Sequence, residues 1–160
     1  MTLTACGFHL RGYYPVPPEL HTLCLQTELP YDEFTKQLKW YLVANKIQLV
    51  DDQKQAPITL KILSADYSQT QTAMGANQQT KVFNLVYNVD YQLLDRNGRA
   101  LQEPQTIVVS RNYSVTSNQL LGDQTVQSNL VTQMQRDAIY EIMARISSKS
   151  TIKAIYDEAY

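Results

Sequence analysis

The residue best placed to carry chemistry is a cysteine near the start of the chain, in the run Leu3-Thr4-Ala5-Cys6-Gly7. A leucine, two small residues and a cysteine form the processing signal of a bacterial lipoprotein, whose cysteine becomes the acylated N-terminus. Each acyl methylene buried in a bilayer contributes about 0.8 kcal/mol, so several acyl chains hold a protein at a membrane. Glycine follows the cysteine in place of the aspartate that favours the inner membrane. The pattern predicts Cys6 as a lipid anchor in the outer membrane, with an ordinary free thiol as the alternative.

Neither a basic segment nor a long apolar stretch precedes this signal, although export signals contain both. We therefore expect the sequence to begin close to the processing site. No later stretch approaches the roughly 20 apolar residues of a membrane-spanning helix.

Other nucleophiles and metal ligands are sparse. His21 and Cys24 form one His-x-x-Cys pair, and His9 lies beside the predicted anchor. A zinc site needs three or four ligands, and a nucleophile needs a base and an orienting acid. The five glycines form no phosphate-binding loop. The sequence therefore predicts no metal, no cofactor and no enzyme activity. We expect Cys24 to pack as a small buried hydrophobe, with a disulfide to Cys6 as the alternative.

The composition indicates one domain without a nucleic-acid partner. A chain of 160 residues can bury one adequate core. Its 14 lysines and arginines are balanced by 15 aspartates and glutamates, so it has no basic excess for binding nucleic acid. The 11 tyrosines suit either a wet protein interface or half-buried strand positions.

Prolines and hydrophobic spacing divide the chain into three parts. Three prolines between positions 15 and 18 favour an extended run, so we expect residues 6–19 to be a lipid-anchored leader. Residues 20–150 are predicted to form a single domain, and residues 151–160 a frayed tail or a short helix.

The domain begins with a short strand around residues 23–25 and a helix that Pro30 opens and Asn45 caps. Residues 47–50 are interpreted as an extended exit into a turn. The apolar face of the helix, at helical spacing, is Phe34, Leu38, Tyr41 and Leu42.

Three strand patterns and a long helix follow. Alternating apolar residues mark strands over residues 58–63, 83–93 and 107–115. Asp95-Arg96-Asn97-Gly98 is typical of a hairpin turn. Asp123 is predicted to cap the helix, whose apolar row is Val126, Leu130, Met134, Ala138, Ile142 and Ile146.

This order of elements favours an α+β domain of two layers, with two helices packed on one face of a small, mixed, four-stranded sheet. We expect the first two strands to be parallel through a crossover that contains the first helix. The later strands are expected to be antiparallel.

The segment from Tyr67 to Thr80 contains no charged residue and is rich in glutamine, threonine and serine. One interpretation is a mobile hairpin tip. The other is a surface that docks against another protein, where bare charges would be costly to desolvate. For docking, the candidate residues are Thr72, Met74 and Gly75.

Arg111 lies out of pattern on an otherwise apolar strand face. Either a carboxylate such as Asp90 satisfies it, or it binds an anionic group, since a guanidinium binds phosphate bidentately. With Lys81, Arg96 and Arg99, it is the candidate set for binding a phosphorylated amphiphile.

The residues after the lipid signal, Cys6-Gly7-Phe8-His9-Leu10-Arg11-Gly12, resemble the start of the mature LPS-assembly lipoproteins of the LptE family. The similarity extends over nearly the whole chain. Further segments that are similar to the family are Val16-Pro17, Gln37-Leu38, Ile47-Gln48-Leu49-Val50 and Arg111-Asn112-Tyr113.

The resemblance implies two helices on a four-stranded sheet and a plug inside the outer-membrane barrel LptD, which together place lipopolysaccharide in the outer leaflet. Some members of the family bind lipopolysaccharide through basic loops, but Met74-Gly75-Ala76 and Leu121-Gly122-Asp123 contain no lysine or arginine. We therefore expect a plug and assembly role on the periplasmic side. The alternatives are a lipopolysaccharide-binding carrier and a lipoprotein activator of an envelope enzyme.

Overall fold

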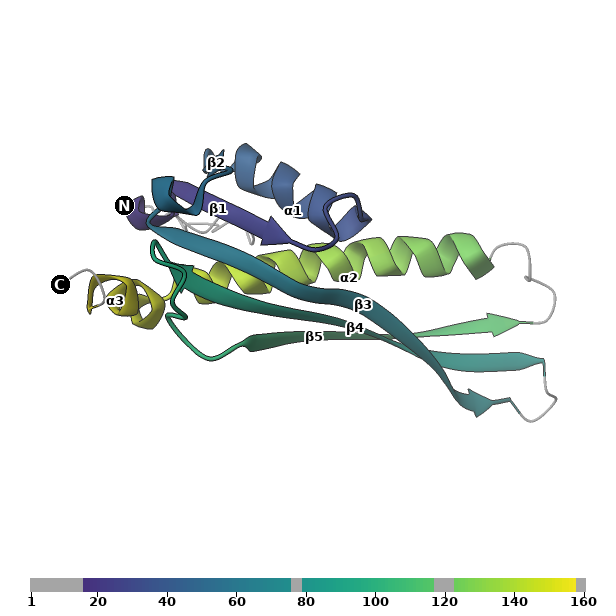
Figure 1. Ribbon diagram of the computed structural model, residues 1–160. Helices are drawn as coiled ribbons and strands as arrows, with labels where there is room; N and C mark the ends of the chain where they lie inside the picture. Colours follow the sequence, from purple (N-terminus) through teal and green to yellow (C-terminus); the bar gives the residue numbers. More distant parts are fainter. Residues whose placement is uncertain (1–15, 76–78, 117–122, 158–160) are drawn as a thin grey trace, which may run out of the picture.

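The computed structural model describes residues 16–75, 79–116 and 123–157, which form a mixed sheet with helices packed against it (Figure 1). The strands are β1 (Thr22–Thr27), β2 (Gln48–Val50), β3 (Ile58–Met74), β4 (Thr80–Asp95) and β5 (Gln105–Thr116). The helices are α1 (Glu33–Ala44), α2 (Asp123–Ile146) and α3 (Lys149–Asp157), with short 3-10 turns at Pro18–Leu20 and Gln53–Gln55. No helix in these ranges is long and apolar enough to cross a bilayer.

The five strands lie in the order β2-β1-β3-β4-β5. β1 is parallel to both β2 and β3, which confirms the predicted parallel unit, and β3, β4 and β5 are antiparallel. The predicted α+β class is confirmed, but the expected four strands are wrong. The additional strand is β2, which pairs only with β1 and is three residues long, too short to show an alternating pattern.

The described residues form three helices where two were predicted. The third, α3, begins at Lys149 and occupies most of the expected tail. Ser148 and Thr151 stabilise its start, because the Thr151 N–H donates to Ser148 Oγ at 3.3 Å and Thr151 Oγ1 donates to the Arg145 carbonyl at 2.9 Å.

α1 and α2 pack against each other and against the same face of the sheet. α1 begins at Glu33, three residues after the predicted Pro30, because Asp32 Oδ1 accepts from the Thr35 N–H at 2.9 Å as an N-cap. Asn45 caps its C-terminal end, as predicted. The largest fully buried side chains of the core come from both the helices and the sheet: Leu20, Leu23, Phe34, Leu38, Leu42, Ile58, Leu60, Leu85, Tyr91, Leu93, Ile107 and Met134.

The sheet extends beyond β1 as a long three-stranded arm (Figure 1). Pairing of β1 with β3 ends at Thr27 and Ile62, whereas β3 continues to pair with β4 as far as Met74 and Lys81. The hairpin-tip interpretation of residues 67–80 is therefore wrong for residues 67–74, which are strand. Serine, threonine and glutamine form a strand here because the backbone pairs with β4 from Asp66 to Gln71 and again at Ala73 and Met74.

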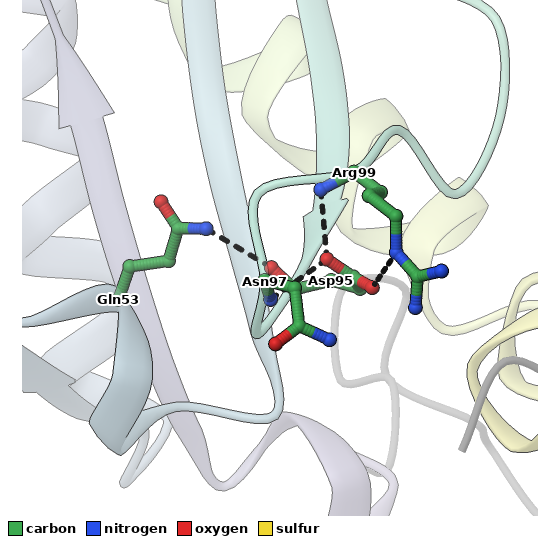
Figure 2. Close-up of polar contacts among 4 residues, drawn as sticks. All are labelled: Gln53, Asp95, Asn97 and Arg99. Atoms are coloured by element: carbon green, nitrogen blue, oxygen red, sulfur yellow. Dashed lines mark hydrogen bonds and ion pairs between the residues drawn. The ribbon is translucent and has the colours of Figure 1, made fainter. Parts of the chain in front are cut away.

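The turn between β4 and β5 is held by one carboxylate (Figure 2). Asp95 Oδ1 accepts from the N–H groups of Asn97 at 2.8 Å and Arg99 at 2.7 Å, and Asp95 Oδ2 accepts from Arg99 Nε at 3.0 Å. Gln53 Nε2 donates to the Asp95 carbonyl at 3.2 Å. Gly98 has a φ of +82°, so the predicted hairpin turn is confirmed.

Gly98→Ala is expected to lower the free energy of unfolding by about 1–2 kcal/mol, because an L-residue is strained by about this amount in the left-handed region. A Cβ at this position also lies 3.0 Å from Gln53 Nε2. Gly98→Asn is expected to lose less, since asparagine tolerates positive φ. Urea denaturation of the three proteins measures both differences, and equal losses in the two variants would contradict the backbone explanation.

Candidate docking surface

The three-stranded arm of the sheet leaves a long segment of β3 exposed to solvent. We define the strand arm as residues 66–74 of β3 with their paired residues 81–88 of β4 and 108–115 of β5. On β3 every residue of the arm is exposed, and Asp66 is the one charged residue of that strand segment. The arm therefore presents hydroxyl and amide groups to its surroundings.

One face of the strand arm carries a polar ladder. Asn84 Nδ2 donates to Ser110 Oγ and to Asn112 Oδ1, both at 2.8 Å, which joins β4 to β5. Side chains alternate along a strand, so this ladder lies opposite the face on which Leu85 is buried. No described helix covers the ladder side, and its groups remain available to a partner.

The other face of the strand arm is held by α2. Gln127 Nε2 of α2 donates to Gln69 Oε1 at 2.7 Å, and Gln69 Nε2 donates to the Tyr113 hydroxyl at 3.2 Å. The rings of Phe83 and Tyr113 stack with their centroids 5.4 Å apart. These contacts fix the arm relative to the helices and leave its ladder face and outer edge exposed.

The outer edge of β3 is open beyond Ile62, because no strand in the described part of the chain pairs with it there. An open edge presents unpaired N–H and C=O groups that can accept another strand, and proteins commonly guard such edges with charge, proline or bulges. Here β3 has register shifts at Ile62/Ser64 and Gln71/Ala73 and only Asp66 as a charge between them.

The predicted docking residues lie together at the end of the strand arm. Met74 is 51% exposed, Thr72 Oγ1 donates to the Val82 carbonyl at 3.4 Å, and the Gly75 N–H donates to the Thr80 carbonyl at 2.7 Å. Their proximity follows from the β3–β4 pairing. Their role in docking remains a prediction.

The four predicted cations do not lie together. Lys81 is at the start of β4, whereas Arg96 and Arg99 are in the turn after its last residue, about 45 Å away at about 3.3 Å per residue. Arg111 lies opposite Leu85, four residues along β4 from Lys81 and ten from Asp95. Arg99 is also engaged by Asp95 at 3.0 Å.

Arg111 is satisfied by a carboxylate, but from α2 and not from β4. Its guanidinium forms an ion pair with Asp137 and donates to the Ser110 carbonyl at 2.9 Å. The predicted partner, Asp90, accepts instead from Ser64 Oγ at 2.9 Å and from Thr106 Oγ1 at 2.6 Å.

Of the two cysteines, Cys24 lies within the described residues. Cys24 is buried, as predicted, and its Sγ lies 3.7 Å from the Asp51 carbonyl oxygen. Cys6 lies outside the described residues. Within the described ranges, no group of three or more histidine, cysteine, aspartate or glutamate side chains is arranged to hold a metal ion.

Sequence comparison identifies the family. The LptE family model, described as lipopolysaccharide-assembly, matches residues 20–146. The chain belongs to the LptE family. The matched region excludes the first 19 residues, so it confirms independently the resemblance first seen after Cys6.

Curated LptE relatives match different lengths of this LptE-family chain. The LPS-assembly lipoprotein LptE of Yersinia enterocolitica is 33% identical over 96 residues, which cover 59% of this chain and 46% of the relative. The protein of the same name from Pectobacterium atrosepticum is 25% identical over 142 residues, covering 88% and 76%. The chain thus spans about half the length of the Yersinia relative. Relatives with these names are assembly lipoproteins, and LptE is not an enzyme family.

Two solved structures share the LptE-family fold. A minor lipoprotein from Acinetobacter baumannii is 26% identical with a TM-score of 0.63, covering 80% of this chain and 91% of that one. A lipoprotein B from Nitrosomonas europaea is 21% identical with a TM-score of 0.74, covering 91% and 94%. The second likeness concerns the fold alone.

Sequence reasoning missed two features of this LptE-family chain. The first is the arm's hydrogen-bonding, in which Gln69 and Asn84 are central, and no spacing rule predicts these pairs. The second is Trp40, the single tryptophan, which is 73% exposed on α1. The sequence does indicate this exposure, because the helical spacing that buries Phe34, Leu38 and Leu42 leaves Trp40 on the solvent side.

Proposed function

We propose that this chain is a non-catalytic outer-membrane lipoprotein that docks into the LptD barrel through its strand arm and so helps to place lipopolysaccharide in the outer leaflet. Membership of a lipopolysaccharide-assembly family supports the process. The observation that carries the docking mode is the strand arm, a long exposed extension with hydroxyl and amide groups on its surface.

The chemistry of the strand arm fits a polar lumen. The interior of an outer-membrane barrel is polar and water-filled unless a plug occupies it. Residues 67–74 of the arm carry no charged side chain, so this segment avoids the desolvation that charged groups would require, and its amides and hydroxyls can exchange water for hydrogen bonds with the wall. The Asn84 ladder and the open β3 edge supply both donors and acceptors for such bonds.

The lipid anchor completes the proposal. Acyl chains on Cys6 would hold the protein in the periplasmic leaflet of the outer membrane. The ten Cα-to-Cα steps from Cys6 to Val16 span at most about 35 Å when extended. This leader is long enough to let the domain reach a barrel in the same membrane, and short enough to keep it beside that membrane.

Thr72→Lys is expected to reduce the LptD that co-purifies with the full-length, lipidated protein by at least about tenfold, because a buried unpaired charge costs more than 1.4 kcal/mol. Thr72 is exposed, so the melting temperature should not change. Affinity purification from outer membranes with quantitative mass spectrometry measures the ratio of the two proteins.

Gln55→Lys is the matched control, since Gln55 is exposed at the far end of the sheet in the 3-10 turn after β2. It should retain the barrel. Normal co-purification of Thr72→Lys would contradict docking through the strand arm. Absence of any barrel in the wild-type sample would overturn the proposal and return the enzyme-activator alternative.

Binding of isolated lipopolysaccharide through Lys81, Arg96, Arg99 and Arg111 is a separate prediction. Two of these cations are in ion pairs and the four are spread along the sheet, so nothing in their arrangement favours it as a second function. Salt-sensitive binding that is lost on alanine substitution at all four positions would support it.

A further inference from the structure

The solvent side of α1 carries apolar side chains that the rest of the described fold leaves uncovered. Trp40 is 73% exposed and Val43 is 61% exposed, one turn apart on a helix at the surface of the molecule (Figure 1). The opposite side of the helix is the one that packs, because Phe34, Leu38 and Leu42 are fully buried there. The exposed indole and the valine methyl groups therefore meet water and are not needed for the core.

Lysines accompany these apolar side chains on the same face of the helix. Lys36 is four residues before Trp40 and seven before Val43, and Lys39 is four before Val43, which places all four side chains on one side. Lys46 follows the end of the helix. We call these five residues the α1 outer face.

The charge of the α1 outer face is not neutralised within the described part of the protein. Its three lysines are exposed, and none of them forms an ion pair with another described residue. Glu33, in the first turn, is the one carboxylate of α1. Residues 33–46 thus have a net charge of +2, next to an exposed apolar surface.

Exposed indole and methyl groups beside free ammonium groups match the surface of an anionic bilayer. An indole ring is amphipathic and concentrates at the headgroup level of membranes. Lysine stems lie along apolar surface while their ammonium groups reach the lipid phosphates. A helix with apolar residues on one side and lysines beside them lies in the plane of the bilayer. An acidic polypeptide would pair with the lysines but would offer Trp40 no hydrocarbon.

The first described residues of the chain lie near the end of α1 that carries Lys46. The His21 carbonyl accepts from the Gln48 N–H at 2.8 Å, two residues after Lys46. The Val16 carbonyl lies 3.2 Å from His21 Nε2, so the leader joins the domain at this end. The proposed acyl anchor would therefore keep the α1 outer face within about 35 Å of the leaflet that holds it.

We propose that the α1 outer face lies on an anionic phospholipid bilayer, with its apolar side chains at the headgroup level and its lysines on the lipid phosphates. The contact is peripheral, since no helix in the described ranges is long and apolar enough to cross a bilayer. The inference goes beyond barrel docking and does not rest on it, because α1 lies in the helix layer and the docking residues lie at the end of the strand arm.

Vesicle binding tests the proposal on the full chain with Cys6→Ser, which cannot be acylated, so that only the domain contributes. The vesicles contain about 30% phosphatidylglycerol in phosphatidylethanolamine, and pure phosphatidylcholine vesicles are the comparison. Co-sedimentation measures partitioning, and the emission of Trp40, the single tryptophan, reports its entry into the interface. Partitioning into the anionic vesicles should be at least about tenfold stronger, with a blue shift.

Lys36→Gln combined with Lys39→Gln should weaken partitioning into the anionic vesicles at least about tenfold, since each lysine near such a surface contributes about fivefold. Trp40→Ala should also weaken it, as measured by co-sedimentation. Lys149→Gln combined with Lys153→Gln is the matched control, because it removes the same charge from exposed positions of α3, and it should bind like the unsubstituted domain. The melting temperature should be unchanged throughout.

The lysine variants of α1, made in the full-length lipidated protein, should co-purify with the barrel normally, which separates failure here from failure of barrel docking. Three results would overturn the proposal. The first is no partitioning into the anionic vesicles. The second is an equal loss in the α1 and α3 lysine variants, which would mean unselective attraction. The third is tight binding of polyglutamate with no shift of tryptophan emission on vesicles, which would make this face a site for an acidic protein.

Discussion

Replacing Phe34 with alanine is expected to lower the free energy of unfolding by about 3–5 kcal/mol, the usual cost of removing a fully buried aromatic ring. Phe34 has no exposed surface and packs on Tyr87 with ring centroids 6.0 Å apart. This contact joins the first turn of α1 to β4, which lies between β3 and β5 in the sheet. Urea denaturation followed by circular dichroism measures the loss, with an unchanged denaturant slope if the folded state is otherwise retained.

Trp40→Ala is the internal control for Phe34→Ala, because it removes a larger ring from the same helix. Trp40 is 73% exposed, so its replacement should change the unfolding free energy by no more than about 0.5 kcal/mol. A comparable loss in the two variants would mean that α1 does not pack through its Phe34 face.

Asp95→Asn is expected to lower the free energy of unfolding by about 1.5–3 kcal/mol, the contribution of hydrogen bonds to a charged group. The carboxylate is almost buried and accepts three hydrogen bonds from Asn97 and Arg99 (Figure 2). An amide keeps one acceptor oxygen and turns its nitrogen toward a donor, so at least one of these bonds is lost.

The effect of Asp95→Asn should depend on pH. Burial alone would raise the pKa of the Asp95 carboxyl, but hydrogen bonds from the Arg99 and Asn97 N–H groups and from the Arg99 guanidinium outweigh it and lower the pKa. A lowered pKa in the folded state means that the stabilisation is complete above the ordinary aspartate pKa of about 3.9 and is lost as the pH falls through the lower value.

Unfolding measured from pH 7 to pH 2 tests this dependence. The difference in unfolding free energy between the wild type and Asp95→Asn should be constant above about pH 5 and should decrease below about pH 4. Asp51→Asn serves as the control, since the Asp51 side chain is exposed at the end of β2. A gap that persists unchanged at pH 2 would show that the carboxylate charge is not the source of the stability.

The sequence predicts best those elements that bury one face. β4 alternates apolar and polar residues along its length because one side packs on both helices and the other does not. α1 could be located for the same reason. The parallel pairing of β1 with β3 was also predictable, because a helix between two strands restricts the topology to few solutions.

The remaining features depend on distant partners. β2 is a strand only because Leu49 pairs with Leu23 of β1. Residues 67–74 carry no apolar alternation, and they are strand because β4 supplies a template for their backbone. Arg111 was expected to meet a carboxylate, but the choice of Asp137 over Asp90 is set by where α2 crosses the sheet, which no local pattern encodes.

Of the candidate site, the proximity of Thr72, Met74 and Gly75 could be predicted because they are neighbours in sequence. The contact of the strand arm with α2 could not, because Gln69 and Gln127 are 58 positions apart in the sequence and meet only through the tertiary fold. Binding sites formed between elements are generally invisible to spacing rules for this reason.

The position of β1 has a consequence for the order in which the protein folds. Leu23 pairs with Leu49 on one side and with Ile58 on the other, so both neighbours of β1 follow it in the chain. β3, β4 and β5 form a meander of sequential neighbours, whose contacts close short loops and therefore form quickly. During synthesis or export, β1 therefore emerges before either of its neighbours. Its backbone remains incompletely paired until β3 has also emerged. The amino-terminal half of this chain cannot finish folding before the middle of the chain is present.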